Sequence, residues 1–289
     1  AVMVKAGALA YLASLPTAEG YLISRPYLHD TLSLLRFAAV QNYFGTASKA
    51  RVKDLAPLLS DSLKAIRIAA VQNLMSMDNI ELDSIQRKSF DAAQNEFLSF
   101  LEYSAFFSSS RQNLGIYYLR NNDAINAIKQ FKTAIRIDDK YFPAMLNLAQ
   151  TYSKTGNIYL AEKWLKTILR SDSNNIEALR YMGLLKAEQK NYKEALIYME
   201  KVSKLNPQND RNYYNLGLVY EYLGQSEKAR QPLLKALSLN PENYDYLYAL
   251  GLNFLSANDN KEAQMMASKI IELYPREKGG YIIQSKIKQ

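Results

Sequence analysis

The sequence predicts an all-α protein in which stacked helical hairpins form a right-handed superhelix, or solenoid. Three observations predict this class. Only 11 Gly and 8 Pro occur in 289 residues, which favours helices over a turn-rich β architecture. A 31-residue period runs through the first quarter of the chain, and a 34-residue period runs through its second half. Tandem repeats of this length are typical of solenoids, whose units stack on their neighbours along the chain.

Residues 1–77 carry the shorter period. Lys5, Arg36 and Arg67 recur with this period, and each lies in an alanine-rich amphipathic run. An aspartate precedes each of the two arginines by six residues, at the head of a helix, where a carboxylate can cap free N–H groups. The pattern resembles the short form of the HEAT repeat, and we expect the aspartates and arginines to form a structural ladder between repeats. The first unit lacks its leading half, so we expect that the chain begins within a longer gene product.

Residues 78–107 are expected to bridge the two arrays with one helix. Ser84 is the predicted N-cap. Apolar side chains then follow at helical spacing: Phe90, Ala93, Phe97, Leu98, Leu101 and Tyr103. The helix mimics the second helix of a 34-residue repeat, and we expect it to pack on the first repeat, with Phe106 and Phe107 as core contacts. The array would then run through the whole chain.

Five 34-residue units follow, at 108–141, 142–175, 176–209, 210–243 and 244–277. Small residues recur in two columns, the first being Gly115, Ala149, Gly183, Gly217 and Gly251, and the second Ala127, Ala161, Ala195, Ala229 and Ala263. They would allow the two helices of one repeat to cross closely. Turn-like residues separate the two helices, as in Thr155-Gly156-Asn157, and Pro207, Pro241 and Pro275 close three repeats. The pattern closely resembles the tetratricopeptide repeat, and residues 278–289 are predicted to form a C-terminal capping helix.

The composition excludes several kinds of site. Because the chain has no Cys and one histidine, His29, it cannot form disulfides, thiolate metal sites or a site that needs two imidazoles. We found no catalytic constellation and no phosphate-binding Gly-rich loop; Gly279-Gly280 is interpreted as a linker. No stretch reaches the roughly 18 apolar residues that a membrane helix needs. The sequence therefore predicts a protein that is not an enzyme, with no catalytic residue, metal, cofactor or membrane span.

The net charge of +8 arises mainly in the second half of the chain. An excess that is spread over many helices is typical of a solvated surface, whereas nucleic-acid binders cluster their positive charge. Nucleic acid is therefore not an expected partner, and RNA binding through the basic charge and the tyrosines ranks last among the alternatives.

The resemblance to tetratricopeptide repeats implies a ligand groove, because the first helix of each hairpin lines the concave face in that family. The candidate groove residues lie two or three positions before the first small-residue column, with one nearby cation: Asn113, Asn147, Arg180, Tyr181, Arg211, Tyr214, Asn215 and Tyr248. Three asparagines in one column resemble the ladder by which some family members hold a peptide backbone, since an amide can both donate and accept hydrogen bonds. The clamp that other members use for chaperone C-termini is disfavoured, because its Lys and Asn columns hold Gln112 and Ile116.

Two functions follow from these resemblances. The first is a protein-interaction scaffold that binds an extended peptide or a partner helix in the concave groove. The alternative is an accessory C-terminal module of a larger periplasmic redox protein, because HEAT-like repeats before tetratricopeptide repeats resemble the C-terminal region of some bacterial multihaem cytochromes c. This chain cannot itself attach haem through a CxxCH motif, since it has no Cys. Its location would be periplasmic in the second case and cytoplasmic otherwise.

Overall fold

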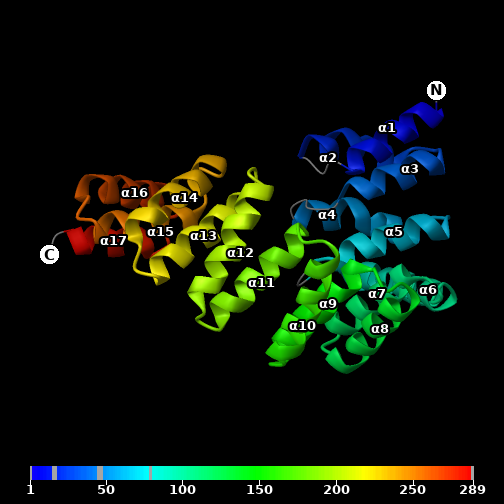
Figure 1. Ribbon diagram of the computed structural model, residues 1–289. Coiled ribbons are helices and arrows are strands. Elements are labelled where there is room, and N and C mark those ends of the chain that lie inside the picture. Colours follow the sequence, from blue (N-terminus) through cyan, green and yellow to red (C-terminus); the bar gives the residue numbers. More distant parts are fainter. Residues whose placement is uncertain (1, 15–17, 44–47, 78–79, 288–289) are drawn as a thin grey trace. The chain divides into compact units, whose positions relative to one another are not determined.

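The computed structural model describes residues 2–14, 18–43, 48–77 and 80–287, which form helices and connecting turns without a β-strand (Figure 1). The all-α prediction is confirmed. The chain divides into two compact units, residues 1–114 and 115–289, so the division falls within helix α7 (Ser108–Arg120). The last two residues of the predicted capping segment lie outside the described residues.

The N-terminal unit is a stack of short helices that alternate with 3-10 turns. Its elements are α1 (Val2–Ser14), α2 (Ala18–Ser24), η1 (Arg25–His29), α3 (Ser33–Val40), η2 (Gln41–Tyr43), α4 (Ser48–Leu55), η3 (Ala56–Ser60), α5 (Lys64–Met75) and α6 (Ser84–Tyr103), followed by the first part of α7. Helix α3 packs between α1 and α5, and α5 packs on α6. Paired alanines face the core of this stack, since Ala38 and Ala39 on α3 and Ala69 and Ala70 on α5 are buried.

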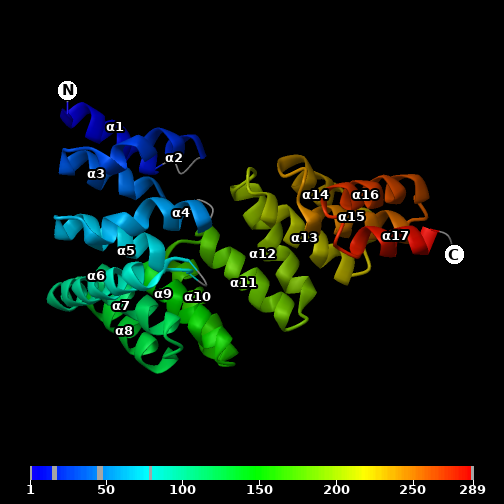
Figure 2. The same cartoon turned by 180° about the vertical axis from the view of Figure 1, so that it is seen from behind.

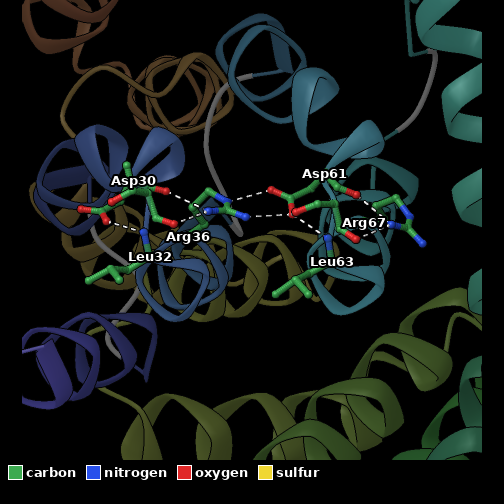
Figure 3. A network of polar contacts seen from close by, with 8 residues as sticks. Asp30, Leu32, Arg36, Asp61, Leu63 and Arg67 are labelled. Atoms are coloured by element: carbon green, nitrogen blue, oxygen red, sulfur yellow. Dashed lines mark hydrogen bonds and ion pairs between the residues drawn. The ribbon is translucent and has the colours of Figure 1, made fainter.

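An ion-pair ladder joins successive repeats of this unit (Figure 3). The Arg36 guanidinium donates to both carboxylate oxygens of Asp61, at 2.7 and 3.0 Å, and to the carbonyl oxygen of Asp30. One repeat later, Arg67 donates to both oxygens of Glu96, at 2.9 and 2.6 Å, and to the carbonyl oxygen of Asp61. The predicted ladder of aspartates and arginines is therefore present. Its last carboxylate is Glu96 on α6, which the sequence did not identify.

A second ladder is made by two asparagines at equivalent positions of successive repeats. The Asn42 amide donates to the carbonyl oxygens of Leu9 and Ala38, and the Asn73 amide donates to those of Val40 and Ala69. Asn42 thus links the end of α3 to α1, and Asn73 links α5 to the end of α3.

Helix α6 begins one residue earlier than predicted. Its N-cap is Asp83, whose carboxylate accepts from the backbone N–H groups of Ile85 and Gln86, while the Gln86 side chain accepts from the Asp83 backbone. This reciprocal capping box satisfies donors that the helix leaves free. Ser84, the predicted cap, is instead the first helical residue.

Three aromatic side chains near the end of α6 are exposed, although we expected them in the core. Tyr103 lies off the buried stripe that ends at Leu101, and its exposed fraction is 84%. Phe106 and Phe107 lie in the turn after α6 and pack against each other, with ring centroids 4.4 Å apart. The backbone of that turn is held by polar contacts, including the donation of Arg111 to the Ala105 carbonyl, so it does not need buried rings.

The C-terminal unit consists of helical hairpins in chain order (Figure 2). After α7 come α8 (Ala124–Ile137), α9 (Phe142–Lys154), α10 (Ile158–Ser171), α11 (Ile176–Glu188), α12 (Tyr192–Leu205), α13 (Asp210–Tyr222), α14 (Ser226–Leu239), α15 (Tyr244–Ser256), α16 (Asn260–Leu273) and α17 (Gly279–Ile287). From α8 onward, each helix packs against the next one in sequence. This stacking is typical of a helical repeat solenoid.

The hairpin turns have the same backbone geometry in every repeat. One residue in each turn has a positive φ angle, and these residues are Asn122, Gly156, Lys190, Gly224 and Asn258. The N–H of the next residue donates to the carbonyl five residues earlier, as Asn157 does to Tyr152 and Asn191 does to Lys186. This is the Schellman ending of a helix, in which a left-handed residue reverses the chain. The predicted turns are therefore confirmed.

The first small-residue column allows close helix crossing, as expected. A Cβ atom added at Gly115, Gly183 or Gly217 would lie less than 3.0 Å from the large side chain sixteen residues later, which in the third repeat is Met199. The last repeat differs, because Gly251 faces Ile283 of α17. Gly279 and Gly280 are not a linker. They are the buried first residues of α17, and they pack against α15 and α16 at distances too short for a side chain.

Three residues after the first small-residue column, four repeats hold an aromatic residue (Tyr118, Tyr152, Tyr220 and Phe254), and the third repeat holds Lys186. The Lys186 side chain is buried, and its ammonium group pairs with Glu162 at 3.0 Å and Glu194 at 3.1 Å. Burial alone would lower the pKa of Lys186, but the two carboxylates outweigh it and the pKa is raised. The exception in the column is therefore a buried charge held by the neighbouring helices.

Candidate peptide groove

Most of the predicted groove residues lie on the first helices of the repeats in the C-terminal unit. Asn147 lies on α9, Arg180 and Tyr181 on α11, Arg211, Tyr214 and Asn215 on α13, and Tyr248 on α15. Asn113 lies on the part of α7 that belongs to the N-terminal unit, so the structure does not place it with the others.

A groove of about 400 Å³ lies between α13 and α15, and we call it the tyrosine groove. Its lining residues are Tyr214, Leu218, Glu221, Tyr222, Asp245, Tyr248, Ala249, Leu252 and Asn253. Tyr214 and Tyr248, both predicted, occupy equivalent places on successive first helices. The structure therefore brings these two predicted residues together in one groove.

The charge at the mouth of this groove is set by Asp245 and Arg211. The Arg211 guanidinium lies 5.5 Å from the centre of the Tyr214 ring and pairs weakly with Asp245 at 3.9 Å. Burial and the nearby Asp245 carboxylate raise the pKa of Tyr214, so its hydroxyl stays neutral. The position over this ring thus already accommodates a cation.

Glu221 and Asn253 of the tyrosine groove belong to a partly buried hydrogen-bond network that was not predicted from the sequence. The Asn253 amide donates to a Glu221 carboxylate oxygen and to the Ser226 carbonyl, and its oxygen accepts from Arg230. Arg230 also pairs with Asp259 at 2.7 Å. The network holds Glu221 on the groove wall. One signal was available, because Asn253 stands in a column that holds Leu185 and Val219 in the two preceding repeats.

Tyr181 lines a smaller pocket, of about 150 Å³, between α9 and α11. Arg180 lies over the Tyr181 ring at 4.3 Å and pairs with Glu177 at 2.5 Å. The Arg180 guanidinium is thus paired with two residues of its own helix, and it is less available to a ligand than we expected from the sequence.

Asn147 and Asn215 are half-buried and line neither of these cavities. Within the part of the chain that the structure describes, their side-chain amides make no hydrogen bond. Both amides therefore keep their donors and acceptors for another molecule.

Among the described residues, no helix is long and apolar enough to cross a membrane. In that same part of the chain, no cluster of acidic or histidine side chains has the arrangement of a metal site.

Family models identify the repeats of the C-terminal unit. Residues 112–213 match the model for the tetratricopeptide domain of cytochrome c-type biogenesis protein H, and residues 210–243 and 245–276 each match a tetratricopeptide repeat model. No curated protein sequence matches the chain.

Solved structures with the same fold cover about three fifths of the chain. One is MamA (residues 41 to the end) from Desulfovibrio magneticus RS-1, with 26% identity, a TM-score of 0.54, and coverage of 59% of this chain and 96% of that one. Another is YrrB, described as a tetratricopeptide protein with an unusual peptide-binding site, with 16% identity, a TM-score of 0.54, and coverage of 65% and 96%. These likenesses establish a tetratricopeptide solenoid.

Proposed function

Because this chain is a tetratricopeptide-repeat protein, we propose that it is a non-enzymatic scaffold that binds an extended peptide along the first helices of its C-terminal unit. The observation that carries the proposal is the tyrosine groove, in which two residues predicted from the repeat columns line one cavity. A groove between adjacent helices with aromatic walls and few polar groups is the usual form of a ligand site.

The chemistry of the groove favours a peptide with a positively charged side chain. Tyr214, Tyr222 and Tyr248 present aromatic rings, and Glu221 and Asp245 add two carboxylates. A lysine or arginine of the ligand could lie over a tyrosine ring and near a carboxylate, as Arg211 already does within the chain. The free amides of Asn147 on α9 and Asn215 on α13 would hold the peptide backbone along the first helices of the repeats.

The test is affinity capture with mass spectrometry, followed by titration of a peptide from the captured partner. Asn147→Ala with Asn215→Ala should weaken peptide binding by about 1–3 kcal/mol, since two hydrogen bonds are lost. The melting temperature should not fall, because neither amide has a partner within the described chain. Unchanged capture and unchanged affinity would reject the assignment.

The matched control is Asn174→Ala with Asn260→Ala. Both asparagines are exposed, and neither lies on a first helix of a repeat. We expect this double variant to retain full binding. Equal loss in both double variants would indicate a general effect of removing amides and not a groove.

A second candidate is the accessory module of a larger multihaem redox protein. The observation in its favour is the match of residues 112–213 to the tetratricopeptide domain of a cytochrome c-type biogenesis protein. The coding sequence upstream of Ala1 tests it. A reading frame with several CxxCH motifs would support this role, and one without them would exclude it.

A further inference from the structure

A second groove lies on the other helices of the repeats, between α10 and α12, and we call it the basic groove. Its volume is about 370 Å³, and its lining residues are Lys166, Leu169, Arg170, Ser173, Leu179, Ile197, Tyr198 and Lys201. It shares no residue with the tyrosine groove. None of these residues is among the groove residues predicted from the sequence.

The floor of the basic groove is apolar, and one of its walls is an exposed isoleucine. Ile197 is 66% exposed, and Leu179 beneath it is buried. The equivalent positions of the neighbouring repeats hold Lys163 and Gln231, which are polar as expected for a solvent-facing site. The third repeat therefore exposes apolar surface where its neighbours do not, which marks a contact surface.

The rim of the groove is positively charged. Lys166, Arg170 and Lys201 line it, and Lys201 donates to the Ser173 carbonyl, which holds the lysine at the groove. Lys166 pairs with Glu162 on its own helix, and Glu162 also pairs with Lys186. Arg170 and Lys201 have no acidic partner in the part of the chain that the structure describes.

The acidic side chains of α10 and α12 are already engaged elsewhere. Glu162 and Glu194 both pair with the buried Lys186, and Glu200 accepts a hydrogen bond from the Tyr220 hydroxyl. The charge of Arg170 and Lys201 around the apolar floor is therefore not neutralised by the helices that form the groove.

We propose that the basic groove is a docking site for an acidic amphipathic helix of a partner protein. The apolar side chains of such a helix would cover Ile197 and the floor, and its carboxylates would face the Lys166, Arg170 and Lys201 rim. A nucleic-acid backbone could use the rim but would leave Ile197 in water. The apolar floor therefore favours a protein helix, and the partner has the opposite charge to the ligand of the tyrosine groove.

The probe is a fluorescein-labelled synthetic peptide of roughly four helical turns, with Glu on one face and Leu at positions i and i+4. Its anisotropy is titrated with the full chain. Two comparison probes are the same peptide with both Leu replaced by Ser, and a single-stranded oligothymidylate of similar length. The test variant is Arg170→Glu with Lys201→Glu.

The control variant is Lys235→Glu with Lys269→Glu. These residues occupy the Lys201 column in the two following repeats, so the net charge change is the same but lies outside the groove. A third variant, Ile197→Ser, tests the apolar contact, and its exposed side chain can change without unfolding the chain. Circular dichroism and the melting temperature confirm that each variant is folded.

The Leu-containing peptide should bind the unaltered chain and the control variant, and binding should weaken roughly tenfold or more with Arg170→Glu and Lys201→Glu. Binding should also weaken with Ile197→Ser and with the Ser-containing peptide. Equal binding of both peptides, equal loss in the test and control variants, or tighter binding of the oligothymidylate through Arg170 and Lys201 would overturn the proposal. None of these outcomes depends on the tyrosine groove, so the two sites can fail separately.

Discussion

Lys190 occupies a backbone conformation in which two other repeats have glycine. Its φ angle is +60°, and the same column holds Gly156 and Gly224. A residue with a Cβ costs roughly 1–2 kcal/mol in this region, and glycine costs less. Lys190→Gly is therefore expected to stabilise the chain by about 0.5–1 kcal/mol, measured by chemical denaturation. Gly224→Lys is the reciprocal control and should destabilise it; a change of the same sign in both would contradict the argument.

Asn212 has a buried side chain whose oxygen lacks a hydrogen-bond partner in the described part of the chain. The equivalent residues in the two preceding repeats, Ala144 and Ala178, are small and buried. A buried polar atom without a partner costs about 1–3 kcal/mol. Asn212→Ala should therefore raise the midpoint of urea unfolding, and Ala178→Asn should lower it. A lower midpoint for Asn212→Ala would show that the amide has a favourable role.

At the scale of elements, the ladder between α3 and α5 links stability to pH. Burial alone would raise the pKa of Asp61, but the hydrogen bonds from Arg36 and from the Leu63 N–H outweigh it and lower the pKa. A lowered folded-state pKa means that this stabilisation is complete above the ordinary value of about 3.9 and is lost as pH falls through the folded-state value.

Asp61→Asn should therefore destabilise α3 and α5 by roughly 1.5–3 kcal/mol near neutral pH, and by less in acid. Hydrogen exchange of the amides in both helices at several pH values measures the effect. Asp91→Asn, at an exposed carboxylate on α6, is the control. It should change neither the hydrogen exchange of α3 and α5 nor its dependence on pH. A destabilisation by Asp61→Asn that is the same at every pH would contradict the linkage.

The capping helix α17 packs on both α15 and α16, and Ile283 is its fully buried contact. Ile283 fills the space at Gly251 that a side chain from the second helix fills in other repeats. Ile283→Ala should cost about 2–5 kcal/mol, because it leaves a cavity. Ile282→Ala, on the exposed side of the same helix, should cost less than about 0.5 kcal/mol in the same urea titration. An equal loss of unfolding free energy in the two variants would show that α17 does not pack on the last repeat through Ile283.

At the scale of the whole molecule, the regular parts of the fold could be predicted from the sequence because they repeat. The five turns and the close helix crossing at Gly183 could be predicted because each repeat needs a left-handed residue in its turn and a small residue at its crossing. Glu96 could not be predicted in this way. The shorter period places Ala92 opposite Arg67, and the carboxylate comes from one helical turn further along α6.

The candidate groove likewise contains residues that could be predicted from the repeat columns and contacts that could not. Tyr214 and Tyr248 could be predicted, since they lie one repeat apart on equivalent helices. Arg180 was assigned to a ligand, although it packs on Tyr181, because column analysis does not reveal contacts within a helix. For the network of Asn253 and Glu221, the sequence shows only a polar residue in an otherwise apolar column, and it does not indicate which side chains of other helices bond to that residue. Hydrophobicity also misplaced the exposed aromatic residues after α6, since it does not indicate which side of a turn faces water.

The stacking of the C-terminal unit predicts how it unfolds. Because each helix packs mainly on its chain neighbours, a lost contact should weaken the nearest helices most. Met199→Ala, in the middle, should speed hydrogen exchange in α11 to α13 and leave α15 and α16 nearly unchanged. Ile283→Ala, at the end of the unit, should speed hydrogen exchange in α15 and α16 and leave α11 to α13 nearly unchanged. Exchange that rises equally in all helices for both variants would show that the unit unfolds as one cooperative body.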